Sequence, residues 1–313
     1  MDESSPLRTI ATLGLLSCAL PLNLTATALA LIRGRIDRPD REVATDPRTI
    51  LVSGGKMTKA LHLARAFHRA GHRVVLVEAE KYRWTGHRFS RAVDRFHTVP
   101  APGAPGYTEA LLDIIRREAV DIYVPVCSPA SAHFDALAKA ELGEYCEVLH
   151  FDPPTLAMLD DKYAFSAGAD ELGLSVPDAH RIEDPAEVVE FDFAGHHPPY
   201  ILKSIAYDPI RCLELTPLPR PQPEATRAVV TALPISGDNP WIMQSFIAGT
   251  EYCTHSTVRD GRVQLNCCCA SSAVQLNYAT ADVPEIEASA GAAAGITSTS
   301  TSASSPSPTE TDR

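Results

Sequence analysis

Two lysines and one glutamate in the second half of the chain stand where apolar elements end. Lys162 closes the segment Met158–Lys162 and leads into a predicted helix, Lys203 ends an apolar strand, and Glu251 follows another. Each feature alone is ordinary, because a lysine beside aspartates is commonly a solvated ion pair. In this order, two lysines from separate elements can neutralise the phosphates of a nucleotide. The acid can accept its ribose hydroxyls.

The third of these segments, Trp241–Glu251, also suggests a base-binding element. Its apolar run passes through Gln244, Ser245, Phe246 and Ile247 before a predicted bend at a glycine. An edge strand offers unpaired main-chain groups that can hydrogen-bond an adenine. The pattern therefore predicts an edge strand with a base beside it.

A glycine turn in the first half is a second candidate site. Gly54, Gly55 and Lys56 follow the apolar run that begins at Thr49. Neither the phosphate-loop spacing nor the dinucleotide-binding glycine fingerprint is present, although Glu78 stands where the ribose-binding acid of the latter would. A glycine turn opening onto a helix N-terminus suits an anionic small molecule. The alternative is a tight turn without a ligand.

The elements around this turn alternate between strand and helix. Apolar runs predict strands, and positions spaced at three and four residues predict helices. The predicted strands are 49–53, 73–78, 121–126 and 146–151, and the predicted helices are 57–70 and 107–120. The alternation predicts an α/β domain, a doubly wound parallel sheet with helices on both faces.

Length and charge limit the remaining possibilities. The chain has 313 residues and a formal net charge of −11, which argues against a nucleic-acid partner because such proteins present a basic face. Ala288 to Arg313 consist almost entirely of Ala, Ser, Thr, Gly and Pro, a composition typical of disorder. We predict a leader at 1–36, an α/β domain at 48–155, a second domain at 156–280 and a disordered tail at 281–313.

The leader contains no charged residue between Ile10 and Ile32. A helix of that length can cross a bilayer, and the arginines that follow it would hold the next domain in the cytoplasm. A cleaved signal peptide is disfavoured, because its basic residues should precede the apolar stretch. A membrane anchor or interfacial helix and a buried or unstructured leader remain the alternatives.

The eight cysteines fit a reducing compartment better than a metal site. Cys267, Cys268 and Cys269 are consecutive, and neighbouring strand residues point to opposite faces. The three therefore cannot converge on one tetrahedral metal ion. We predict no metal ligands in this chain.

The three spaced segments of the second half resemble the ATP-grasp superfamily of ligases. Longer strings narrow the resemblance to the ligases that form mycosporine-glycine, and it covers roughly residues 10 to 278. The strings are Leu20–Asn23, Ile50–Leu61, Val124–Pro129, Met158–Lys162 and Cys253–Val258. The resemblance implies a doubly wound pre-ATP-grasp domain followed by an α+β ATP-grasp domain.

The resemblance also implies roles for individual residues. Lys162 and Lys203 would bind the ATP phosphates, with Lys203 catalytic, and residues 244–247 would contact adenine while Glu251 binds ribose. Gly54, Gly55 and Lys56 would lie on the substrate side, whereas His255 is either a substrate contact or a strand histidine. In this family ATP phosphorylates an oxygen of a cyclohexenone, 4-deoxygadusol, and the amine of glycine displaces the phosphate, with Mg²⁺ bridging the phosphates.

The magnesium-binding segment of the superfamily has no counterpart in this sequence. That segment carries an acid followed by an acid-x-Asn-Pro-Arg block, and no such block occurs after Tyr278. Glu285 and Glu287 lack the flanking residues, so we do not expect them to bind a metal. We therefore expect the ATP-grasp domain to be incomplete and to lack several core strands, and we expect ligation to be impaired.

Three functional hypotheses follow. The first is an ATP-dependent C–N ligase of the mycosporine-glycine type, and the second is a non-catalytic, truncated ATP-binding or membrane-associated remnant. The third is a nicotinamide-dependent enzyme built on the glycine turn and Glu78, which the missing glycine fingerprint disfavours.

Overall fold

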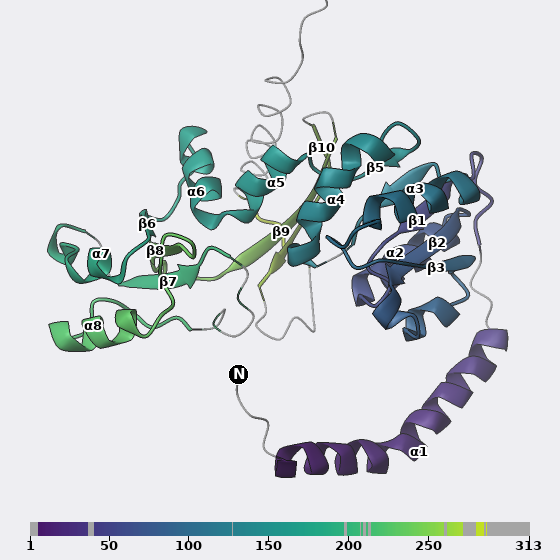
Figure 1. Ribbon diagram of the computed structural model, residues 1–313, viewed down its shortest axis with the longest axis horizontal. Coiled ribbons are helices and arrows are strands. Elements are labelled where there is room, and N and C mark those ends of the chain that lie inside the picture. The colour runs from purple at the N-terminus through teal and green to yellow at the C-terminus, as the bar shows by residue number, and fades with distance from the viewer. Residues whose placement is uncertain are drawn as a thin grey trace, which may run out of the picture.

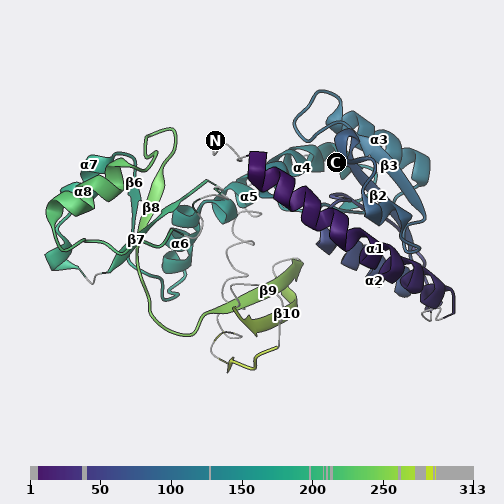
Figure 2. The ribbon, with the colours of Figure 1, turned by 90° about the horizontal axis from the view of Figure 1, so that it is seen from below.

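The computed structural model (Figures 1 and 2) describes most of the chain between residues 6 and 286. The described residues are 6–36, 41–126, 128–196, 199–206, 208, 211, 214–259, 262–271, 280–284 and 286. Glu285, Glu287 and almost all of the predicted tail lie outside them. The domain boundaries given above therefore stay predictions.

The first half forms a parallel sheet of five strands in the order β3-β2-β1-β4-β5. The strands are β1 (Thr49–Val52), β2 (Arg73–Ala79), β3 (Arg95–Val99), β4 (Ile122–Val124) and β5 (Glu147–Val148). The helices of this half are α2 (Thr58–Arg69), α3 (Tyr107–Glu118) and α4 (Pro129–Leu142), and 3-10 turns occur at Glu80–Tyr82 and Gly86–Phe89. The doubly wound prediction is confirmed, and β3 and α4 are additions to it.

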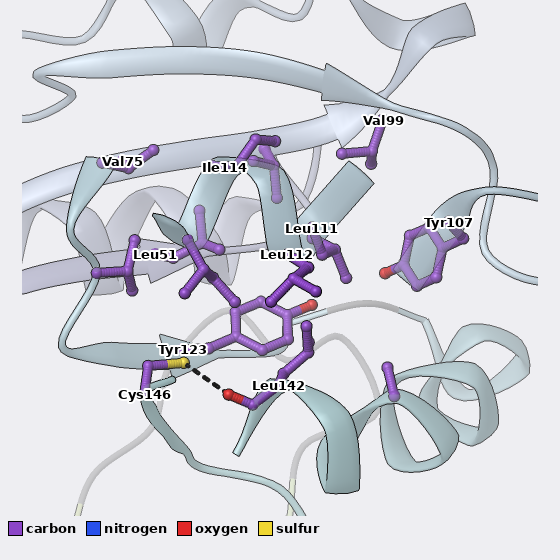
Figure 3. Packing of buried hydrophobic residues seen from close by; sticks show 14 residues of the cluster. Leu51, Val75, Val99, Tyr107, Leu111, Leu112, Ile114, Tyr123, Leu142 and Cys146 are labelled. Atoms are coloured by element: carbon purple, nitrogen blue, oxygen red, sulfur yellow. Dashed lines mark hydrogen bonds between the residues drawn. The ribbon is translucent and has the colours of Figure 1, made fainter. Parts of the chain in front are cut away.

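The core between this sheet and helices α3 and α4 is apolar (Figure 3). Leu51 of β1 and Leu111 of α3 are fully buried in it. The hydroxyls of Tyr107 and Tyr123 donate to Asp135 Oδ1 at 2.7 and 2.9 Å. Asp135 thus links α4 to α3 and β4 inside the layer.

The second half forms an antiparallel sheet of three strands in the order β6-β8-β7. The strands are β6 (Ala179–Ile182), β7 (Tyr200–Ser204) and β8 (Trp241–Ser245). The helices are α5 (Pro153–Asp160), α6 (Lys162–Glu171), α7 (Pro185–Val189) and α8 (Pro223–Thr231), with a 3-10 turn at Phe193–Gly195. In Figures 1 and 2, α7 and α8 lie at the end of this half that is farthest from the five-stranded sheet.

Strand register divides the three-stranded sheet into two faces. Residues paired across antiparallel strands share a face, and successive residues alternate. Tyr200, Leu202, Trp241 and Met243 are buried on one face with Val230 of α8. Lys203 and Gln244 therefore project from the opposite face.

A two-stranded hairpin follows, β9 (Tyr252–Arg259) paired with β10 (Arg262–Ala270). It lies between the two sheets in Figure 1. Arg259 makes an ion pair with Glu147 of β5, with Nη2 and Oε1 2.7 Å apart. The hairpin thus contacts the edge of the first sheet.

The leader forms one long helix, α1 (Pro6–Ile36), which is separate from both sheets in Figure 1. Its segment Thr9–Ala30 is apolar and long enough to cross a membrane, and none of it is buried. The helix bends near its middle in Figure 1. Pro21 lies inside the helix and has no N–H to donate, so one helical hydrogen bond is missing, which is a common cause of a bend.

Candidate functional site

Lys162 is the first residue of α6, and its ammonium group lies against the end of β7. Asp161 caps the helix by accepting hydrogen bonds from the N–H groups of Tyr163 and Ala164. Lys162 Nζ donates to the carbonyls of Ser204 and Ile205 at 2.7 and 2.8 Å. This cap and these bonds fix the position of the charge.

Lys203 lies on β7, next to Ser204, and is half-buried. The pKa of the Lys162 ammonium is lowered, mainly by burial and next by the charge of Lys203. A cation whose charged form is disfavoured by a neighbouring cation marks a site that favours an anion. The structure therefore brings together the two lysines that the sequence predicts as phosphate ligands.

Arg181 of β6 is a third cation on this face, and the sequence analysis missed it. Register places Arg181 and Lys203 on either side of Ile242 of β8, so all three project to the same side. Its guanidinium donates to Asp161 Oδ2 at 3.0 Å, which joins β6 to the N-terminus of α6. The strand residues Ala179–Ile182 lack the apolar alternation that identifies strands, so no local signal marked Arg181.

The predicted adenine-binding segment begins inside a central strand, which corrects the prediction of an edge strand. Gln244 pairs with both Ala179 and Ile201, and β8 ends at Ser245. The N–H groups of Ser245 and Phe246 donate to Asp178 and Pro199 carbonyls, both at 2.8 Å. The N–H groups of Ser245 and Phe246 are therefore not free to bind a base.

Past the end of β8, the chain is open to solvent. Phe246 is 45% exposed and Ile247 is 70% exposed, which is unusual for large apolar side chains. Glu251 is also exposed and directly precedes β9. An apolar base could cover the first two side chains while the acid reaches a ribose.

His255 lies on β9, opposite Cys267 of β10, and is exposed. The next pair on the same face of the hairpin is Cys253 and Cys269, which lie opposite each other two positions along the register. Burial raises the pKa of the Cys269 thiol. Because β9 belongs to a different sheet from Lys203, strand pairing does not bring His255 to the lysine pair. The role of His255 stays a prediction.

The glycine turn lies at the carboxyl end of β1, between β2 and β4, where the sheet order reverses. Gly54 has a φ of 68°. The N–H groups of Gly55 and Lys56 donate to Val77 O at 3.1 Å and Glu78 Oε2 at 2.8 Å. Since these amides already have protein partners, they are not available to an anion.

Because Glu78 accepts the Lys56 N–H, its carboxylate stabilises the turn and is not placed as a ribose ligand. It is 7% exposed, and its second oxygen accepts from the N–H of Ala79 at 2.8 Å. Lys56 Nζ lies 3.8 Å from the centre of the Tyr82 ring. Lys56 is the first cause of the lowered pKa of the Tyr82 hydroxyl.

A cavity of about 470 Å³ lies elsewhere, against β3 and α3. Arg83, Arg88 and Arg117 line it with His97, but none of the predicted site residues does. Arg88 in its wall stacks on Phe96 at 4.7 Å. The cavity thus lies in the first half of the chain, whereas Lys162 and Lys203 belong to the second half.

Magnesium, which the family resemblance implies, would find two of the described carboxylates beside the lysines, Asp161 and Glu183, already engaged by protein partners. Mg²⁺ at a nucleotide needs carboxylate oxygens that are free to bind it. Asp161 Oδ1 accepts two helix N–H groups and Oδ2 accepts from Arg181. Glu183 is also paired with Arg181.

No protein-family model matches this chain, and no curated protein matches it either. Solved structures do match. An L-amino acid ligase from Bacillus licheniformis aligns with a TM-score of 0.58 and 15% identity, over 80% of this chain and 61% of its own.

Biotin carboxylases match to a similar degree. The enzyme from Campylobacter jejuni, solved with an ATP analogue, gives a TM-score of 0.56 at 13% identity, over 80% of this chain and 59% of its own. The biotin carboxylase domain of the Hydrogenobacter thermophilus 2-oxoglutarate carboxylase was solved with MgADP and bicarbonate. It aligns with a TM-score of 0.54 at 15% identity, over 80% of this chain and 58% of its own. The chain thus has an α/β fold of the ATP-grasp type and spans about three fifths of the length of these proteins.

Proposed function

We propose that this chain is the nucleotide-binding part of an ATP-dependent C–N ligase of the mycosporine-glycine-forming type. One observation carries the proposal: Lys162 and Lys203, from different elements, meet at one end of the three-stranded sheet. The ATP-grasp type fold supports nucleotide binding at that position. The strings shared with the mycosporine-glycine-forming ligases support the substrate class.

In the proposed reaction, the lysines neutralise the charge of the transferred phosphoryl group. An enol oxygen of the cyclohexenone attacks the γ-phosphorus, and the bond to the β,γ-bridging oxygen breaks, releasing ADP. The amine of glycine then attacks the carbon that carries the new phosphate ester. Phosphate leaves with the C–O electron pair, and the nitrogen loses a proton.

The chain's residues divide these tasks by position. Lys203, half-buried on the sheet, is one of the two phosphate contacts. Lys162 adds a second charge from α6, and Phe246, Ile247 and Glu251 follow β8 at the proposed base and ribose end. Gly54–Lys56 at the carboxyl end of β1 would serve the cyclohexenone and amino-acid side through the Lys56 side chain, since the amides of Gly55 and Lys56 are already bonded.

ATP binding without ligation is the second candidate function. It is favoured by the engaged state of Asp161 and Glu183, two carboxylates beside the lysines that already have protein partners. The two functions share one nucleotide site and differ in turnover.

An assay with ATP, Mg²⁺, glycine and 4-deoxygadusol separates these functions. Product absorbing in the ultraviolet at the mycosporine-glycine retention time, with matching ADP release, supports the ligase. Saturable ATP binding without product favours the second candidate. If ATP does not bind at all, both are wrong, and binding of a nicotinamide cofactor instead would favour the third hypothesis.

We also propose that α1 anchors the chain in a membrane, with the following domains in the cytoplasm. The 22 residues Thr9–Ala30 extend roughly 33 Å at about 1.5 Å per residue, against ~30 Å for a bilayer core. Ser17, Thr25 and Thr27 each donate to the carbonyl four residues earlier, at 2.7 to 2.9 Å, so these hydroxyls need no water.

Vesicle flotation tests this anchor. The full chain should float with phosphatidylcholine vesicles, and a variant lacking residues 1–36 should stay in the dense fraction. Equal distribution of the two proteins would contradict the anchor.

A further inference from the structure

Asp178, His180 and His196 form a compact cluster on the far side of the sheet from Lys203. Asp178 precedes β6, His180 lies within it, and His196 follows the 3-10 turn Phe193–Gly195. His180 pairs in register with Met243, whose side chain is in the apolar core, so it projects away from the lysine face. The cluster is therefore independent of the proposed ATP site.

The ligand atoms of the cluster have the spacing of a metal site. Asp178 Oδ1 lies 3.3 Å from His180 Nε2, and Asp178 Oδ2 lies 3.1 Å from His196 Nδ1. All the potential ligand atoms lie within 4.8 Å of one another. Bonds of 2.0–2.1 Å in a tetrahedron place ligand atoms roughly 3.3 Å apart.

The surroundings hold the three side chains in place. Phe191 packs against both imidazoles, with ring centres 4.8 Å from His180 and 4.6 Å from His196. The Tyr200 hydroxyl donates to Asp178 Oδ2, the outer hydrogen bond that commonly orients a metal-binding carboxylate. The side chains are 32 to 43% exposed, so solvent can supply a fourth ligand.

We propose that Asp178, His180 and His196 bind one Zn²⁺ ion, with water as the fourth ligand. Two imidazoles and one carboxylate are ligands that Zn²⁺ accepts, whereas Mg²⁺ and Ca²⁺ prefer oxygen alone. The ion ties the start of β6 to the segment before β7. Because the Asp178 carbonyl accepts the N–H of Ser245, it also fixes the end of β8. The sequence could not mark this site, since its residues are up to 18 positions apart.

Zinc titration of the full chain tests the proposal. Calorimetry in the presence of a phosphine reductant should give one ion per chain. H196Q and D178N should each weaken Zn²⁺ binding at least about tenfold, and Y200F should weaken it less. H62Q, which changes an exposed histidine of α2, is the matched control and should bind as the parent does.

A thiol control separates this site from the cysteines of the hairpin. C269S should retain the ion, and Co²⁺ should give visible absorption in C269S that is absent in H196Q. If zinc binds H196Q and the parent equally, or is lost only in C269S, the proposal is wrong. Circular dichroism of each zinc-free variant verifies that a lost ion is not a lost fold.

Discussion

Replacing Lys203 with methionine should weaken ATP binding by roughly 10- to 150-fold. Methionine keeps most of the side-chain length but removes the charge. A hydrogen bond to a charged group is worth about 1.5–3 kcal/mol, and ~1.4 kcal/mol corresponds to tenfold in affinity. Lys203 is half-buried rather than fully buried, so we expect this range and not the larger loss of a fully desolvated charge pair.

The pH dependence of binding adds a second observable. The charge of Lys203 contributes to the lowered pKa of Lys162. Removing that charge raises the pKa of Lys162 toward its ordinary value. The alkaline loss of ATP affinity, which follows deprotonation of Lys162, should therefore move to higher pH in K203M.

Titration calorimetry with ATP from neutral to alkaline pH measures both effects. K59M is the matched control, because Lys59 is an exposed lysine of α2 in the other sheet domain. It should bind ATP like the parent chain. A folded K203M that binds ATP within twofold of the parent, with an unchanged pH profile, would remove Lys203 from the site and refute the reasoning.

Three further predictions concern other residues. E251Q should lower ATP affinity up to about tenfold while leaving 2′,3′-dideoxy-ATP unaffected, because only ATP offers ribose hydroxyls; equal losses for both ligands in calorimetry would contradict this. D135A should lower the free energy of unfolding in urea by about 2–4 kcal/mol, since two buried tyrosine hydroxyls lose their acceptor, whereas the exposed D113A should change it little. Arg73 is the first cause of the lowered pKa of Glu118, so the stability from this carboxylate is present above its unfolded pKa of about 4.3 and is lost as pH falls through the folded value. E118Q should show a smaller acid-induced fall in Tm, and an unchanged fall would exclude Glu118 as a source of it.

The sequence predicted the elements whose signal is local. The strand before Gly54, the helix from Lys162 and the strand ending near Lys203 all appear at those positions. Each has an apolar period and a clear boundary residue, and these features do not depend on distant parts of the chain.

The elements that the sequence missed depend on tertiary pairing. Strand β6 reads Ala-His-Arg-Ile, without apolar alternation, and is a strand because β8 supplies its hydrogen-bond partners. For the same reason β8 could not be recognised as central, and Gln244 was assigned to an edge. The cluster at Asp178 forms only when the segment carrying His196 returns to the start of β6.

Lysine footprinting tests the central claim that ATP phosphates bind between Lys162 and Lys203. The native chain is labelled with an amine-reactive ester with and without saturating ATP, and modified peptides are quantified by mass spectrometry. We expect ATP to protect Lys162 and Lys203 several-fold and to leave the labelling of Lys59 unchanged. Saturating ATP that protects neither lysine would contradict the claim.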